Sequence, residues 1–118
     1  MKYMILSYEP KADLGEEDSP HAARPILHTG LWLDFIETLH RAGIIRSIHH
    51  FRPDFTATTV RLRDGRTVLH DGAYADSNEQ IAACLVIEVA NLDAALSWAE
   101  RCPAAASGAV EVAPVVSR

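Results

Sequence analysis

The stretch Ala82-Ala83-Cys84-Leu85-Val86-Ile87-Glu88-Val89 is almost continuously apolar and decides how the rest of the chain folds. A strand with one solvent-exposed face alternates apolar and polar side chains, and this stretch lacks that alternation. We therefore expect a core strand that is buried on both faces. Such a strand needs helices on one face and a partner on the other.

Downstream of this strand, the sequence predicts a helix and a final strand. Asn91 is a favourable N-cap for a helix that runs to about Cys102, and Pro103 follows its end. A linker of small residues at 104–108 leads into a strand at 109–116. The apolar stripe of the helix consists of Leu92, Ala95, Leu96 and Ala99.

Upstream of the core strand, the sequence predicts a β-hairpin with strands at 58–63 and 66–70. Asp64-Gly65 joins them, and this pair favours a type I′ turn because glycine takes positive φ at little steric cost. Residues 71–74 then form a turn and 77–80 a short helical turn. The two-residue turn Asp64-Gly65 pairs Leu62 with Thr67, Val60 with Leu69 and Thr59 with His70. One hairpin face is therefore apolar, and the other carries Arg61, Arg63, Arg66 and His70.

The N-terminal part predicts a strand at 2–8, a polar loop at 9–25 that covers a site as a lid, and a helix at 28–42 ended by Gly43. A strand at 44–51 follows, in which the adjacent His49 and His50 must point to opposite faces. The helix has an apolar stripe of Leu31, Trp32, Phe35, Ile36 and Leu39, with His28 near its centre. The fold class is thus α+β, a ferredoxin-like βαββαβ unit with an inserted β-hairpin.

Composition restricts the class of protein. A chain of 118 residues predicts one domain, 1–118, with a radius of gyration of roughly 13–14 Å. With a formal net charge of −5 and no dense Lys/Arg cluster, nucleic-acid binding is disfavoured. No apolar run reaches the eighteen or so residues of a membrane helix, and no signal peptide is evident, so we expect a cytoplasmic protein. Cys84 and Cys102 are then free thiols.

Histidine is the unusual component, with six in the chain. One interpretation is an acid–base site, because histidine titrates near neutral pH and a carboxylate can orient it. Its candidate residues are His49, His50, His70, Asp71 and Tyr74. The competing interpretation is structural: Asp71 caps a turn, Tyr74 packs against a helix and His70 is solvated.

Other sites have weaker support. A metal site would have to converge from separate strands, because no HxH, HxxxH or HExxH spacing is present, and no metal is predicted. Motifs for nucleotide cofactors and the GxSxG motif of serine hydrolases are also absent, so no cofactor is predicted. The row of hairpin arginines could hold an anionic ligand, although such a row is more often a solvated surface.

Five segments resemble the YCII-related, or DGPF-type, family. They are MKYMILSY at the start, AGI after the first helix, ATTVRLRDGRTVLHDGAYADSNEQ at 57–80, LDAALSWAERCPAA, and GAVEVAPVV near the end. Together they are distributed over nearly the whole length of the chain, in the family's order. The resemblance implies a ferredoxin-like unit that pairs through its sheet into a homodimer, a dimeric α+β barrel.

The sequence departs from the family pattern in three places. Asp71-Gly72-Ala73-Tyr74 stands where the family has Asp-Gly-Pro-Phe, and Ala82-Ala83-Cys84-Leu85 stands where it has a Gly-Gly-Tyr-Tyr-like stretch. His49-His50 replaces small or acidic residues. These changes cluster around the expected barrel, which predicts a ligand surface different from that of typical members.

Besides a catalytically degenerate relative whose barrel is filled with side chains, two functions follow as hypotheses, and whether the chain is an enzyme stays open. The first is binding of a small organic molecule in the barrel cleft, with His/Asp acid–base chemistry of the lyase or isomerase kind. The alternative is a non-enzymatic regulatory or interaction module, because many members of the family are associated with extracytoplasmic-function sigma factors.

Overall fold

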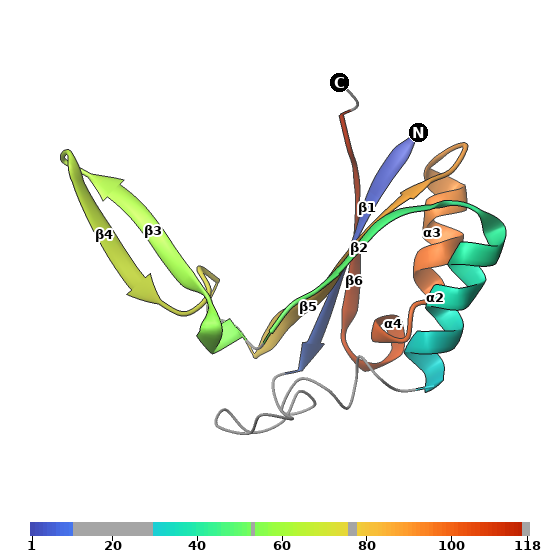
Figure 1. Cartoon of the computed structure of the whole chain (residues 1–118), viewed down its shortest axis with the longest axis horizontal. Helices are drawn as coiled ribbons and strands as arrows, with labels where there is room; N and C mark the ends of the chain where they lie inside the picture. Colours follow the sequence, from blue (N-terminus) through green and yellow to red (C-terminus); the bar gives the residue numbers. More distant parts are fainter. Residues whose placement is uncertain (11–29, 53, 76–77, 117–118) are drawn as a thin grey trace.

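The computed structural model describes residues 1–10, 30–52, 54–75 and 78–116. Their elements follow one another along the chain as drawn in Figure 1. They are β1 Lys2–Pro10, α2 Gly30–Ala42, β2 Ile45–His50, the 3-10 helix η2 Asp54–Thr56, β3 Thr58–Arg63, β4 Arg66–Asp71, β5 Glu79–Glu88, α3 Leu92–Glu100, α4 Ala104–Ser107 and β6 Ala109–Pro114.

The main sheet is antiparallel and has the strand order β2-β5-β1-β6. β1 and β5 form its centre, and β2 and β6 are joined to it at the two edges. This order, with α2 and α3 as the connecting helices, confirms the ferredoxin-like α+β fold. β3 and β4 form a separate two-stranded sheet, which is the inserted hairpin.

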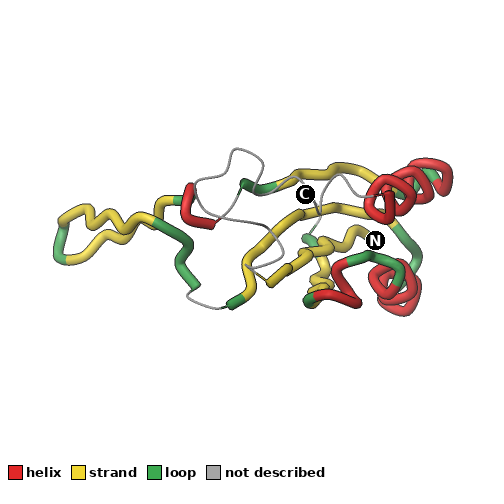
Figure 2. Tube along the Cα trace, turned by 90° about the horizontal axis from the view of Figure 1, so that it is seen from below, coloured by secondary structure: helices red, strands yellow, loops and turns green. Residues whose placement is uncertain are grey.

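The helices cover one face of the main sheet (Figures 1 and 2). The core lies between them and consists of alternate residues of β1 and β5 packed against Trp32, Phe35 and Leu39 of α2 and Ala95 of α3. Trp32 and Phe35 meet edge to face, with ring centroids 6.1 Å apart. Asn91 caps α3 as predicted, because its side chain accepts a 2.9 Å hydrogen bond from the Ala94 amide.

The opposite face of the sheet, which we call the uncovered face, carries Met4, Leu6 and Tyr8 of β1 with Cys84 and Val86 of β5. All of these are half-buried, whereas their neighbours on the helix side are buried. β5 was predicted to be buried on both faces, and in one chain only its helix side is. The described helices thus leave this apolar face of the sheet uncovered.

The hairpin β3–β4, which we call the arm, projects away from the sheet on the side of the uncovered face (Figure 1). Its pairing is as predicted, with Leu62 opposite Thr67 and Val60 opposite Leu69. Asp64 and Gly65 have φ of 52° and 74°, as a type I′ turn requires. The arm also explains why the radius of gyration is 15.7 Å and exceeds the expected value.

Several predicted boundaries were wrong. β1 continues through Glu9 and Pro10, which had been assigned to the loop, because both pair with the start of β5. Glu79 and Gln80 belong to that strand and not to a helical turn. The linker 104–108 contains the short helix α4, and α3 ends at Glu100. On α2, Leu31 is 71% exposed and lies off the buried stripe. His28, which was predicted to begin the first helix, and residues 11–25 of the expected lid lie outside the described residues.

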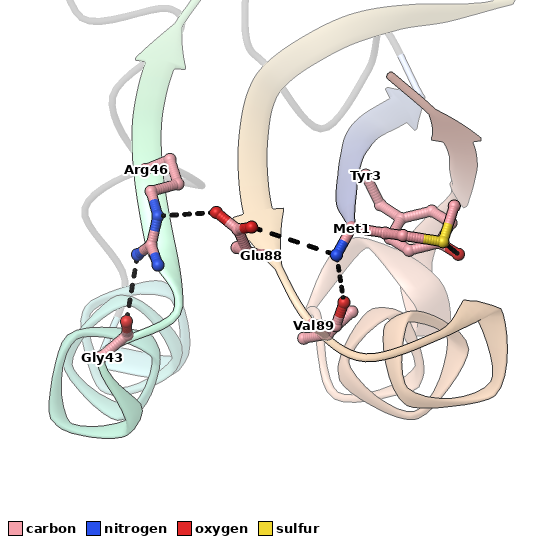
Figure 3. Close-up of polar contacts among 6 residues, drawn as sticks. All are labelled: Met1, Tyr3, Gly43, Arg46, Glu88 and Val89. Carbon is pink, nitrogen blue, oxygen red and sulfur yellow. Dashed lines mark hydrogen bonds and ion pairs between the residues drawn. The ribbon is translucent and has the colours of Figure 1, made fainter. Parts of the chain in front are cut away.

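A polar network joins three strands at the end of the sheet where the N-terminus lies (Figure 3). The Met1 amino group donates to the Val89 carbonyl at 2.8 Å and lies 4.0 Å from the Glu88 carboxylate. Arg46 donates to that carboxylate at 3.3 Å and to the Gly43 carbonyl at 3.0 Å. These groups are largely exposed, so we expect a modest contribution to stability.

A substitution at Gly108 tests how closely β6 must approach β1. A Cβ at this position would collide with the carbonyl oxygen of Tyr8, whereas a Cβ at Gly30 would meet nothing within 4 Å. We expect Gly108→Ala to lower the free energy of unfolding by about 1–3 kcal/mol, because the backbone must shift. Gly30→Ala is the control and should not destabilise the protein. Equal denaturation midpoints for the two variants would contradict this account.

Candidate functional site

The arm carries a pocket of about 270 Å³. Its walls are the side chains of Thr59 and Arg61 from β3, Val68 and His70 from β4, and Tyr74 from the following loop. The Arg61 guanidinium lies over the Tyr74 ring, 5.0 Å from its centroid, which is a cation–π contact. The structure thus brings two predicted site residues, His70 and Tyr74, together.

Local geometry explains how Tyr74 reaches this pocket. Gly72 has φ of 111°, a conformation that side chains disfavour, and it turns the chain sharply after β4. Its amide donates to the Ala57 carbonyl at 2.7 Å, and its carbonyl accepts from the Thr59 hydroxyl at 2.9 Å. These two bonds hold the turn against the base of the arm, so that the chain comes back along the arginine face.

Asp71 lies on the other side of the arm. β4 extends through Asp71, one residue further than predicted, and Asp71 pairs with Thr58. Side chains alternate along a strand, so Asp71 shares a face with Leu69 and Val60 while His70 points to the opposite face. In a single chain, therefore, the pocket holds the candidate histidine and phenol without the candidate carboxylate.

His49 and His50 lie on β2, in a different part of the molecule from the arm pocket. The register pairs His49 with Cys84 and His50 with Ala83. Cys84 is half-buried on the uncovered face and Ala83 is buried on the helix side, so the two histidines project to opposite faces as predicted. Both side chains are exposed.

The uncovered face also holds a polar pair that the sequence did not indicate. The Tyr8 hydroxyl donates to the Glu111 carboxylate at 3.1 Å, between β1 and β6. Partial burial raises the pKa of Tyr8, and the hydrogen bond and negative charge of Glu111 raise it further. Because Leu6 is paired with both Cys84 and Glu111, His49 and Glu111 occupy the two ends of one row across this face.

A second polar group lies on the helix side. Glu9 is 1% exposed, and its carboxylate accepts a 2.6 Å hydrogen bond from the Ser107 hydroxyl of α4. Burial raises the pKa of the Cys102 thiol to about 11, and the Glu9 carboxylate adds to the rise. This group was not predicted, because Glu9 had been assigned to the loop and Ser107 to a linker.

The described residues show neither a metal-binding cluster nor a membrane-spanning helix. Among them, no three His, Cys, Asp or Glu side chains come together in a way that could hold a metal ion. Cys84 and Cys102 are free thiols. No described helix combines the length and apolar character that crossing a membrane requires.

The raised pKa of Cys102 predicts a loss of stability at high pH. Between pH 9 and 11 the thiol ionises in the unfolded chain, at its ordinary pKa of 9.0, but stays protonated in the fold. Ionisation therefore favours unfolding, by about 2–3 kcal/mol at pH 11. Cys102→Ala should lose correspondingly less stability over this range in urea titrations. Identical pH dependence of wild type and variant would refute the assignment.

Two comparisons with known proteins bear on identity. A model of the YCII-related domain family matches residues 1–117. An uncharacterized protein of Rhizobium meliloti (strain 1021) is 33% identical over 76 residues, which is 63% of this chain and 61% of that protein. The matched stretch thus spans less than two thirds of that relative.

Proposed function

Because the chain belongs to the YCII-related family, we propose that it acts as a homodimer that binds a small organic molecule with an acidic group in the arm pocket. The observation that supports this most directly is the composition of the pocket. It combines a guanidinium, an imidazole, a hydroxyl and an aromatic ring, and the neighbouring carboxylate of Asp71 lies on the other face of the arm.

The surface of the single chain supports the dimer. Its accessible area is 7762 Å², whereas a compact chain of this mass is expected to expose about 6,300 Å². The difference exceeds the roughly 800 Å² that each partner buries in a standard interface. Half-buried apolar side chains on the uncovered face are the natural surface to bury, because they would complete the burial of β5.

The pocket also suggests the ligand's size and charge. Its volume of about 270 Å³ is close to the lower end of the roughly 300–1,000 Å³ range of small-molecule sites. Arginine binds carboxylates through two parallel hydrogen bonds, and a tyrosine ring offers a flat apolar surface. Arg63 and Arg66 share the arginine face with the pocket and would attract an anion towards it.

Acid–base chemistry of the lyase or isomerase kind is the further part of this proposal. In the pocket, the His70 imidazole is the group suited to act as a general acid or base, and the Tyr74 hydroxyl can donate a hydrogen bond. His49 and Asp71 lie outside the pocket, on the uncovered face and on the arm face opposite His70. A pair formed by these two residues would be built between copies of the chain.

The proposed homodimer can be tested by its mass in solution. Light scattering should give about twice the 12.9 kDa chain mass. Leu6→Lys places a charge in the proposed interface and should yield monomers. Leu33→Lys, on α2 where Leu33 is 54% exposed, is the matched control and should remain dimeric. A monomeric wild type would contradict the dimer, and a dimeric Leu6→Lys variant would contradict the uncovered face as its interface.

The anion site in the pocket can be tested by comparing the binding of benzoate, an anionic probe, with that of benzamide, its neutral counterpart. Benzoate should shift the amide NMR signals around Thr59, His70 and Tyr74, and benzamide should not. Arg61→Gln should weaken benzoate binding about ten-fold or more, because a charged hydrogen bond is lost. The control is Arg41→Gln, since Arg41 is exposed on α2 and paired with Glu37.

Equal binding of the two probes, or benzoate affinity unchanged by Arg61→Gln, would contradict an anion site in the pocket. In that case the alternative function gains support, namely a non-enzymatic regulatory module linked to an extracytoplasmic-function sigma factor.

A further inference from the structure

The arm has an apolar face that nothing in the described chain covers. Val60, Leu62 and Leu69 lie side by side on it, and we call them the arm strip. They are 64%, 66% and 65% exposed. The strip lies on the face opposite the pocket, so its exposure does not serve the ligand site.

The arm is poorly supported without a partner. β3 and β4 pair only with each other in the described residues. Isolated two-stranded hairpins are at best marginally stable in water, and packing of an apolar face is what normally stabilises them. A long exposed apolar hairpin also invites aggregation. A surface that covers the strip would remove both problems.

The position of the arm indicates where that surface is. In Figure 1 the arm diverges from the main sheet on the side away from α2 and α3. Figure 2 shows that the arm lies opposite the face of the sheet and does not extend past an edge strand. A protein that packs on the uncovered face therefore lies between sheet and arm. It would contact both of them at once.

We propose that the arm strip docks on a second copy of this chain, so that two copies clasp each other with reciprocal arms. This rests on the proposed dimer but on a different observation, the exposed strip. A second copy fits for two reasons. A two-fold pair buries both strips in one closed assembly. The arm also projects on the side of the uncovered face, so the partner in the proposed dimer would lie within its reach.

The clasp has a consequence for the site. With the strip against the partner, the arginine face and its pocket point away from the contact and stay open to ligand. Docking would also restrict the motion of the arm. The pocket would then be ordered in the dimer and mobile in a monomer, so that its affinity for an anion depends on assembly.

The experiment uses the arm's own arginines as a reporter. Trypsin cleaves after arginine, and Arg63 and Arg66 flank the turn at the arm's tip. Cleavage there is followed by mass spectrometry, with mass by light scattering on the same samples. Wild type is compared with Val60→Asp, on the strip, and with Val68→Asp, which makes the same change on the opposite face.

The expected result is slow cleavage of the arm in wild type, slower as protein concentration rises through the dimerisation range. Val60→Asp should be cleaved about ten-fold faster or more, because the docked state is lost. Val68→Asp should be cleaved as slowly as wild type; its ligand affinity is not part of this control, because Val68 lines the pocket. Leu6→Lys disrupts the dimer at the uncovered face, and it should therefore expose the arm to cleavage as Val60→Asp does.

Three results would overturn the clasp. One is a wild-type dimer whose arm is cleaved as fast as that of Val60→Asp, which leaves the dimer intact and removes only this inference. Another is an equal effect of Val60→Asp and Val68→Asp. The third is protection that does not depend on concentration and persists in monomers, since the arm would then be covered by its own chain.

Discussion

The antiparallel pairing of β1 with β5 is the interaction on which the structure depends. It places Ile5 opposite Leu85 and Tyr3 opposite Ile87, so the two central strands present one continuous apolar surface to the helices. After a register shift between Ser7 and Tyr8, the pairing continues to Pro10 and Glu79, which sets the point where the chain enters β5 from the arm. Core, sheet edges and arm base are therefore positioned by one pair of strands.

Because the helices pack on one side of the sheet only, the other side remains uncovered, and the proposed function follows from that asymmetry. The uncovered face combines half-buried aliphatic side chains with the Tyr8–Glu111 hydrogen bond and His49. The arm stands on the same side and separates its residues by alternation, with the pocket on one face and the strip on the other. Assembly and ligand binding can then use different faces of one hairpin without competing.

Burial of polar side chains is energetically unfavourable, and this fold buries the Glu9 carboxylate and the Cys102 thiol on the helix side of the sheet. Glu9 is held on the helix side by the Ser107 hydroxyl, close to the protonated Cys102 thiol. A buried carboxylate is expensive unless it accepts hydrogen bonds, and α4 supplies the donor from a segment of small residues. The close approach at Gly108 brings this segment against β1, which links the glycine, the serine and the glutamate in one local arrangement.

Features that depend on neighbouring residues could be predicted from the sequence alone. Asp64-Gly65 specified the turn and pairing of the arm, because positive φ at both positions is a local property. The Asn91 cap and the opposite directions of His49 and His50 are equally local. Only tertiary structure decided that β4 includes Asp71, which puts it on the face opposite His70, and that Tyr8 meets Glu111 across 103 residues. Strand ends and cross-strand contacts depend on register, and register is a property of two segments that no single stretch of sequence contains.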